Sequence, residues 1–114
     1  MHEVSIAQSL LEIAINNCKN NGFSRIGNIK VLIGKASGVM PDALLFAFNG
    51  LKVDTAASEA TLEIEEVPVS GYCNLCNKDF TTDEKFILAC PHCDGLSYTL
   101  NSGRELNITE MEVF

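Results

Sequence analysis

The sequence is poor in basic residues and in histidine. It carries 8 lysine and arginine residues against 15 acidic residues, and its formal net charge is -7. Binding of nucleic acid depends mainly on basic side chains that neutralise phosphates, so this balance argues against a nucleic-acid partner. The chain has only 2 histidines, and no set of serine, histidine and acid that would support nucleophilic catalysis is evident.

Long apolar segments are also absent. No run approaches the roughly 18 to 20 apolar residues needed to cross a bilayer, and the N-terminus has neither the charged start nor the cleavage site of an export signal. We therefore expect a cytoplasmic protein that does not associate with membranes and whose thiols stay reduced. The length of 114 residues suits one ordinary domain, or a small domain that carries a smaller one.

Cysteine is a residue type that the sequence does supply, 5 in all. Four of them form two Cys-x-x-Cys pairs, Cys73 with Cys76 and Cys90 with Cys93, and the spacer of residues 77–89 is 13 residues long. Each pair turns back on itself and directs two sulfurs at one ion, and the spacer is long enough for a hairpin to bring the pairs together. This spacing predicts a zinc-ribbon-like, tetrahedral zinc site.

Other uses of these cysteines fit the pattern less well. Disulfides suit a secreted chain, and a redox dithiol suits a Cys-x-x-Cys pair beside a βαβ unit, which neither pair has. Four sulfurs also close the coordination sphere, whereas a catalytic zinc keeps one position open for water, so we expect a structural zinc. His92 could replace a sulfur and make the site respond to pH, but the complete four-sulfur set favours a place outside the coordination sphere.

The apolar pattern predicts two helices. The first runs from about Val4 to Lys19, with apolar residues at three- and four-residue steps, and Asn20-Asn21-Gly22 supplies its stop. Cys18 lies on its apolar stripe and is expected in the core rather than at a metal. The second helix runs from Pro41 to about Val53, because a proline and then an acidic residue open it favourably.

Strands are predicted from β-branched and alternating segments. Ile26 to Ile33 forms a strand closed by Gly34, and Thr61 to Val67 alternates as a half-buried strand whose acidic outer face is more typical of a solvated surface than of a metal site. Ser97 to Leu100 is a short candidate strand. Glu105 to Val113 alternates as a final strand, and Asn101-Ser102-Gly103 turns the chain between the two.

The order of these elements predicts the fold class. Pro68 and Gly71 separate the first helices and strands from the metal lobe. Because the final strand needs an apolar partner face, we expect it to return to the first sheet, which makes the metal lobe an insertion. The prediction is an α+β protein: a small mixed domain with two helices on a three-stranded sheet, and a four-cysteine zinc domain inserted before the last strand.

The N-terminus offers a second metal chemistry. A free terminal amine, the backbone nitrogen of residue 2 and the imidazole of His2 can wrap one ion in a planar, nitrogen-rich chelate, which suits nickel or copper better than zinc. A penultimate histidine is bulky enough to prevent removal of Met1. A histidine at this position is usually only part of a frayed terminus, so this chemistry alone does not establish a nickel site.

Several short motifs, taken in order, carry a family resemblance over essentially the whole chain. They are Met1-His2-Glu3 ahead of the first helix, Gly34 with Ser37-Gly38-Val39, Pro41-Asp42-Ala43-Leu44 ahead of Phe46 and Phe48, the two cysteine pairs, and Gly103-Arg104-Glu105-Leu106 with Ile108 near the end. In this order and spacing they resemble the HypA/HybF family of hydrogenase nickel-incorporation proteins.

The resemblance implies a function and a set of ligands. The family is a non-enzymatic nickel metallochaperone that helps to insert nickel into the large subunit of [NiFe] hydrogenase together with the GTPase partner HypB, and in some organisms it also supplies urease. Its nickel ligand maps onto His2, with Glu3 as a nearby candidate. Its structural zinc ligands map onto Cys73, Cys76, Cys90 and Cys93. In the loop before the second helix, where some members place an acidic residue near the nickel, the candidate is Asp42.

On this basis the sequence predicts two domains with different tasks. Residues 1–69 and 102–114 form a nickel-binding α/β domain, and residues 70–101 form a zinc-binding domain. A zinc lobe tethered by short segments can exchange between two copies, so both a monomer and a dimer are compatible with the sequence.

Two other functional classes remain as alternatives. A zinc-ribbon interaction module without transferable metal is the first, although the acidic balance argues against its nucleic-acid form. An enzyme that uses zinc as a Lewis acid is the weaker one, because four cysteines leave no open coordination position.

Overall fold

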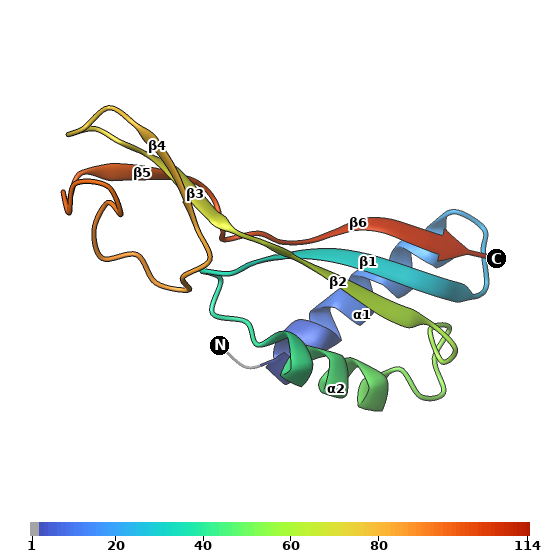
Figure 1. The fold of residues 1–114 in the computed structure, drawn as a ribbon. Coiled ribbons are helices and arrows are strands. Elements are labelled where there is room, and N and C mark those ends of the chain that lie inside the picture. The colour runs from blue at the N-terminus through green and yellow to red at the C-terminus, as the bar shows by residue number, and fades with distance from the viewer. Residues whose placement is uncertain (1–2) are drawn as a thin grey trace. The chain divides into compact units, whose positions relative to one another are not determined.

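The computed structural model describes residues 3–114. The elements, in chain order, are α1 (Glu3–Asn20), β1 (Ile26–Gly34), α2 (Pro41–Leu51), β2 (Thr61–Val67), β3 (Val69–Cys73), β4 (Asp79–Thr82), β5 (Tyr98–Ser102) and β6 (Leu106–Val113) (Figure 1). Within these residues, neither helix is long and apolar enough to cross a membrane.

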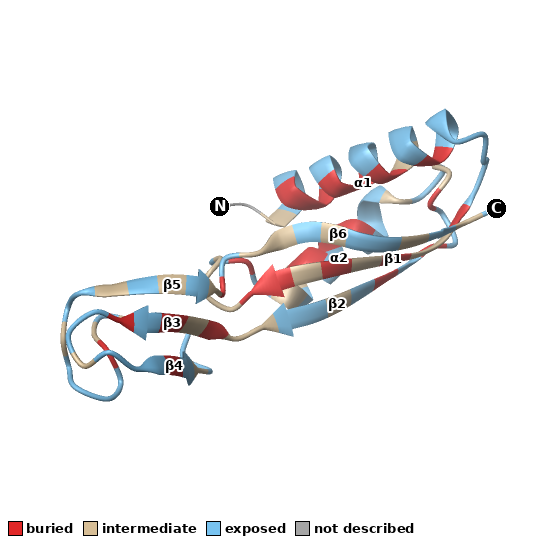
Figure 2. Cartoon of the chain, turned by 90° about the horizontal axis from the view of Figure 1, so that it is seen from above, coloured by how far each residue is buried: buried red, intermediate tan, exposed pale blue. Residues whose placement is uncertain are grey.

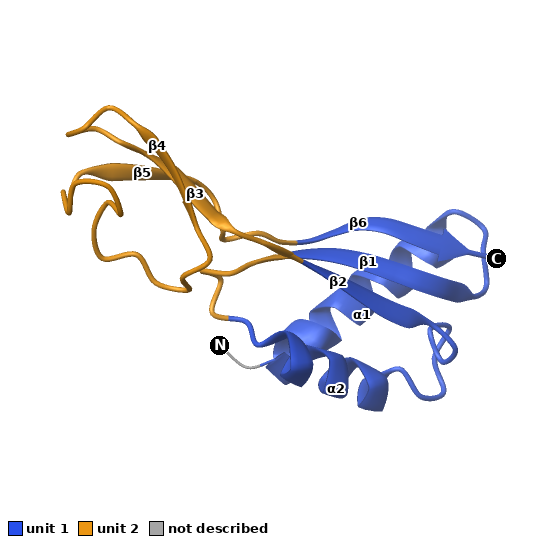
Figure 3. Ribbon diagram, in the orientation of Figure 1, with its two compact units in different colours: residues 1–32, 39–65, 107–114 blue, residues 33–38, 66–106 orange. Residues whose placement is uncertain are grey.

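The chain forms two compact units (Figure 3). Unit 1 comprises the chain up to Leu32, Val39–Glu65 and Asn107–Phe114; unit 2 comprises Ile33–Gly38 and Glu66–Leu106. Unit 2 is therefore inserted between β2 and β6 and also includes the end of β1 and the segment that follows it. The predicted order of elements, with the cysteine lobe inserted before a strand that returns to the first sheet, is confirmed.

Helix α1 forms where the sequence predicts it. Its apolar stripe, from Ile6 to Cys18, is buried, and the side chain of Cys18 is only 1% exposed, which confirms its place in the core. The helix ends in a Schellman motif: the N–H of Gly22 donates to the carbonyl of Lys19, and the N–H of Phe23 donates to the carbonyl of Cys18. Gly22 has a φ of +82°, a conformation that glycine adopts without steric cost.

The first sheet has the order β2-β1-β6. The N–H of Gly34 donates to Glu105 and the N–H of Phe114 donates to Arg25, so β1 and β6 run antiparallel. Strands β1 and β2 point the same way and are joined through α2, as a parallel pair requires (Figures 1 and 2). In β1 the side chains of Ile29, Val31 and Ile33 alternate into the core.

Both helices lie on one face of this sheet (Figure 1), and α1 and α2 pack against each other. Buried residues of α2, among them Leu44 and Phe48, complete the core of unit 1, which Figure 2 shows as red segments on the helices and on β1. The second helix ends at Leu51, two residues before the predicted Val53. Lys52 closes it, since its N–H donates to Phe48, and the hydroxyl of Thr55 then donates to the carbonyl of Lys52, which holds the chain in a turn.

Unit 2 contains a second sheet of order β4-β3-β5, in which β3 pairs antiparallel with both neighbours. Strands β3 and β4 were not among the predicted elements. The hairpin was expected in the spacer between the cysteine pairs. Instead, β3 ends at Cys73 and β4 begins at Asp79, so the first pair lies at the tip of the β3–β4 hairpin.

Gly71 explains why β3 was missed. It was expected to separate the two parts of the chain, but it lies inside the strand, opposite Phe80 on β4 and Leu100 on β5. A Cβ atom at this position would collide with the carbonyl oxygen of Thr99 and the ring of Phe80. Glycine is present here because another backbone approaches closely, not because the chain breaks.

Gly34 marks a similar close approach at the end of β1. A Cβ atom there would collide with the backbone of Gly103, and the N–H of Ala36 donates to the carbonyl of Gly103. Backbone atoms on both sides cannot move aside as a flexible side chain could. The glycine is therefore required by packing.

The substitution Gly34→Ala is expected to lower the free energy of unfolding by about 1–3 kcal/mol, the usual cost of overpacking a tight site. Gly50→Ala is the matched control, because no atom lies within 4 Å of its added Cβ. Since Gly50 is in α2, alanine should stabilise the protein by about 0.5–1 kcal/mol. Urea unfolding followed by circular dichroism measures both; equal effects of the two substitutions would contradict the packing argument.

Candidate metal centre

Two tight turns present the four cysteines. In the first, the N–H of Cys73 donates to Lys78 at 3.0 Å and its carbonyl accepts from Asn77 at 2.9 Å. The second turn repeats this pattern: the N–H of Cys90 donates to Gly95 at 2.8 Å, and its carbonyl accepts from Asp94 at 2.9 Å. Two stretches far apart in sequence therefore adopt the same backbone turn.

The residue after each pair makes the turn possible. Asn77 has a φ of 56° and Asp94 a φ of 60°, in the left-handed region that Asn and Asp tolerate better than most side chains. The cysteine spacing predicts the cluster without regard to these two residues. The signal that could have found them is an Asn or Asp directly after the second cysteine of each pair.

The turns bring all four sulfurs together. The Sγ atoms of Cys73, Cys76, Cys90 and Cys93 all lie within 4.8 Å of one another. The Sγ atoms of Cys73 and Cys93 are 3.6 Å apart, and those of Cys76 and Cys90 are 3.9 Å apart. A tetrahedral zinc with bonds of about 2.3 Å places its sulfurs about 3.8 Å apart. The donor set therefore fits a tetrahedral zinc ion.

Electrostatics at the thiols also favour a bound cation. The backbone N–H of Cys76, 3.5 Å from the sulfur of Cys73, lowers the pKa of the Cys73 thiol to about 6, because it stabilises the thiolate. Burial raises the pKa of Cys76 to about 12. Four thiolates this close together would repel one another. A divalent cation that binds them offsets their negative charge and allows all four thiols to ionise.

The apolar surroundings of the cluster are small. Three residues are buried together, Cys73, Phe80 and Cys90, and two of these three carry cluster sulfurs. The ring of Tyr98 packs edge-on against Phe80 at 6.0 Å between centroids, and its hydroxyl donates to Ile87 at 2.6 Å. This part of unit 2 is therefore held largely around the sulfurs themselves.

The other predicted site residues fall elsewhere. The side chain of His92 is exposed and does not belong to the cluster, although its backbone N–H lies 3.4 Å from the sulfur of Cys90. In residues 3–114 the four cysteines are the one group of three or more histidine, cysteine, aspartate or glutamate side chains placed so that they could hold a metal ion. His2 lies outside the described residues. Glu3 begins α1, and its carboxylate accepts a hydrogen bond from the N–H of Met40 at 3.1 Å.

Comparison with known proteins assigns the chain to a class. The family described as "Hydrogenase/urease nickel incorporation, metallochaperone, hypA" matches residues 1–113. Hydrogenase maturation factor HypA of Rhizobium leguminosarum bv. viciae is 37% identical over 113 residues, and that of Geobacter metallireducens is 41% identical over 113 residues; each match covers 99% of both chains. The fold and the four-cysteine cluster thus occur in a chain similar to nickel metallochaperones throughout its length.

A solved structure has the same fold. The solution structure of the Ni metallochaperone HypA from Helicobacter pylori superimposes with a TM-score of 0.70 at 24% identity, covering 99% of this chain and 97% of that one. The chain belongs to the HypA family of hydrogenase/urease nickel-incorporation metallochaperones, which confirms the resemblance inferred from the sequence.

Substitutions can distinguish the role of the four clustered cysteines from that of Cys18. Purified wild-type protein is expected to contain one zinc per chain, and Cys76→Ser to lose most of it, because a hydroxyl is a poor replacement for a thiolate at zinc. Cys18→Ala, which changes the cysteine buried in α1, is the matched control and should keep the metal. Elemental analysis gives the result; zinc retained in full by Cys76→Ser would rule out the four-sulfur site.

Removal of the metal is expected to unfold unit 2 while unit 1 keeps its structure, since unit 1 has an apolar core of its own. The sequence supplies a specific reporter, because both tyrosines, Tyr72 and Tyr98, lie in unit 2. A strong chelator should abolish the near-ultraviolet circular dichroism of tyrosine and leave most of the helical signal. Added zinc should restore it; an unchanged tyrosine signal in metal-free protein would contradict the prediction.

Proposed function

We propose that this protein binds Ni(II) at its N-terminus and hands it over during maturation of [NiFe] hydrogenase, while zinc in the four-cysteine cluster is structural. The observation that carries the proposal is membership of the HypA family over residues 1–113, with Met1-His2-Glu3 at the start of the match. Residues 1–69 and 102–114 would serve as the nickel-binding domain and residues 70–101 as the zinc domain.

Glu3 supports this placement through its contact with α2. Its carboxylate accepts a hydrogen bond from the N–H of Met40, the N-cap residue of α2. The side chain of Met40 itself makes no capping hydrogen bond. The hydrogen bond ties the beginning of α1, next to His2 in the chain, to the first turn of α2, which contains Asp42. We propose His2 as the main side-chain ligand together with the amine of Met1 and the backbone nitrogen of residue 2. We propose Glu3, which follows His2 in the chain, and Asp42, in the first turn of α2, as sources of further carboxylates.

The two metals would then differ in how easily they leave. Thiolates on two rigid turns hold zinc from all sides, and rearranging them would break the core around Cys73 and Cys90. A planar set made largely of backbone and terminal nitrogens leaves nickel accessible and costs little to rearrange. Slow exchange suits a structural ion and fast exchange suits a cargo.

The partners proposed for this exchange are a HypB-type GTPase and the large subunit of [NiFe] hydrogenase, with urease maturation proteins as further clients. No chemical step is assigned to the protein, and we propose that it is not an enzyme. The four-cysteine cluster supports this view because it offers no open coordination position for a substrate.

Untagged protein with a free Met1 tests the nickel site. After one equivalent of nickel is added and loose metal is removed, wild type should keep nickel, and His2→Ala should keep its zinc and lose nickel. Glu3→Gln keeps an acceptor for the Met40 N–H but removes the charge, so nickel affinity should fall roughly tenfold. Glu12→Gln, an equal charge change at an exposed position of α1, is the control.

Nickel retained equally by wild type and His2→Ala, or by neither, would overturn the N-terminal site. A zinc-stabilised interaction module would then be the better description. The affinities can be measured by competition with a chromophoric nickel chelator, and zinc content in the same samples shows that each variant is folded.

A further inference from the structure

Strand β6 lies at one edge of the first sheet, with β1 as its neighbour. An edge strand presents backbone N–H and C=O groups that can pair with another extended chain. Among the described residues, β6 also has no fully buried side chain, unlike β1, so its inward face is incompletely covered. At this edge of the sheet, β6 can therefore pair with a further strand, and its apolar side chains can be buried further.

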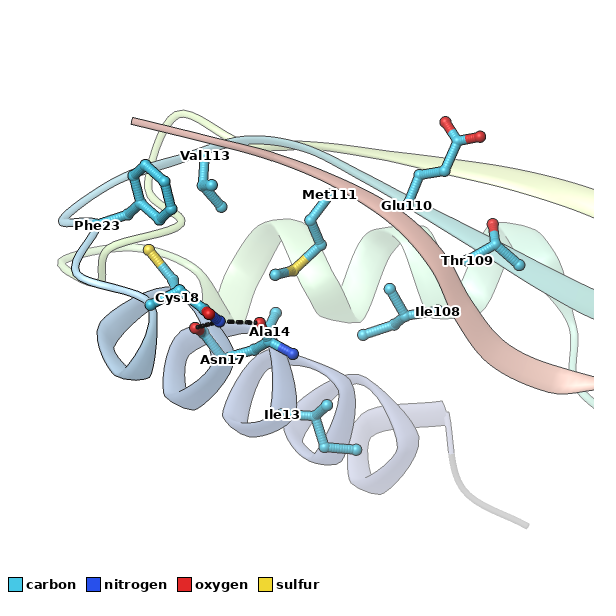
Figure 4. Close-up of a pocket in the computed structure, with 11 residues that line it drawn as sticks. Ile13, Ala14, Asn17, Cys18, Phe23, Ile108, Thr109, Glu110, Met111 and Val113 are labelled. Atoms are coloured by element: carbon cyan, nitrogen blue, oxygen red, sulfur yellow. Dashed lines mark hydrogen bonds between the residues drawn. The ribbon is translucent and has the colours of Figure 1, made fainter.

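A groove of about 420 Å³ runs between β6 and α1 within unit 1 (Figure 4). Ile108, Met111 and Val113 point from β6 toward the helix, and Ile13 and Asn17 lie on the helix side. Ile13 is 58% exposed, a large fraction for an apolar residue of a helix that packs on a sheet. The groove therefore offers apolar contacts directly beside the open edge.

Polar groups border the groove in a way that suits a peptide backbone and basic side chains. The side-chain amide of Asn21 donates to both the carbonyl and the side-chain oxygen of Asn17, each at 2.8 Å, which fixes two amides along the helix wall. On the strand side, Glu110 is the one charged residue among those that line the groove. Glu112 adds a second carboxylate, and β6 contains no lysine or arginine.

The opposite edge of the sheet lacks these features. Strand β2 exposes Glu63 and Glu65, both of which pair with Lys30 at 3.9–4.0 Å. Among its apolar residues, Leu62 is buried and Ile64 and Val67 are half-buried, and none of the three lines the groove. The open edge with a groove is therefore at β6.

We propose that β6 and this groove form a docking site for an extended segment of a partner protein, which adds to the sheet as a fourth strand. Alternate apolar side chains of that segment would fill the groove against Ile13 and Ile108, and basic side chains would face Glu110 and Glu112. Backbone pairing of this kind gives affinity, and the pockets for alternate side chains give specificity.

Charge decides against a second copy of this chain as the occupant. Pairing β6 with β6 of another copy would put the glutamates of both strands beside each other with no basic residue between them, and like charges across strands are destabilising. Each copy also has a net charge of -7, which opposes association with itself. A basic, alternating segment meets the same edge with complementary charge. This inference does not depend on nickel binding.

The probe is a synthetic peptide of about seven residues, the length of an ordinary strand, in which lysine and valine alternate. Titrated into zinc-loaded, ¹⁵N-labelled full-length protein, it should shift amide signals of residues 106–113 and of α1 around Ile13 and Asn17, with a Kd below about 1 mM. A peptide with glutamate in place of each lysine keeps the alternation and reverses the charge, and it should not bind.

Two variants of α1 separate docking from general attraction. Ile13→Lys places a charge in the groove and should weaken peptide binding at least tenfold. Val4→Lys is the matched control: Val4 is 57% exposed on the same helix, does not line the groove and gains the same charge, so binding should persist. Native zinc content and helical circular dichroism in both variants show that the fold is kept.

Three results would overturn the proposal. Binding that weakens equally in both variants would show only attraction between an acidic protein and a basic peptide. Absence of shifts at several times the expected Kd would show that the edge does not accept a strand. A concentration-dependent dimer in sedimentation that Ile13→Lys abolishes and Val4→Lys keeps would identify a second copy as the occupant instead.

Discussion

The backbone turn that each cysteine pair adopts is the constraint on which unit 2 depends. A turn with hydrogen bonds from and to the same cysteine fixes where its sulfur points, and the repetition of this turn at Cys73 and Cys90 makes two such sulfur pairs converge. The first turn also closes the β3–β4 hairpin, so metal geometry and strand register are set by the same few residues. Few apolar side chains are buried there: the buried group is Cys73, Phe80 and Cys90, and two of these three residues carry cluster sulfurs.

Unit 1 is stabilised by an apolar core instead. Its two helices cover one face of a three-stranded sheet, and its core is built from aliphatic residues and Phe48 without any metal ligand among the described residues. The unit proposed to hold zinc and the segment proposed to hold nickel thus differ in what stabilises them. Loss or exchange of an ion at the start of α1 would not remove any part of the core of unit 1.

Local patterns predicted most of the elements because their causes are local. The three- and four-residue apolar steps of α1, its stop at Gly22 and the alternation in β1 and β6 all appear in the structure near the predicted positions. The cysteine spacing likewise predicted the cluster, since each turn is built from consecutive residues. What the pattern could not supply was the partner of each segment. Gly71 has the same appearance in sequence whether a chain breaks there or another backbone passes close by.

The same limit applies to the two sites proposed on unit 1. The exposed Ile13 and the uncovered inward face of β6 are ordinary residues in their own segments and become a groove only when α1 and β6 lie side by side. Glu3 is a common acidic residue in a first helical turn, and its bond to the N–H of Met40 joins residues that are far apart in sequence. Both features arise from tertiary packing, which periodicity does not encode.

The insertion of unit 2 between β2 and β6 has a consequence for how the protein folds. Strand β1 pairs with β6 only after α2, β2 and the whole of unit 2 have been made, so the sheet of unit 1 is completed by a contact of long sequence separation. Such contacts slow folding, because the loop between the paired strands must be closed before the pairing gives any gain. A metal ion that binds the four cysteines early in folding would order unit 2 and bring the two ends of this loop closer together. With zinc in the four-cysteine cluster, as proposed above, zinc supply during synthesis would affect how fast unit 1, which contains none of these four cysteines, completes its sheet.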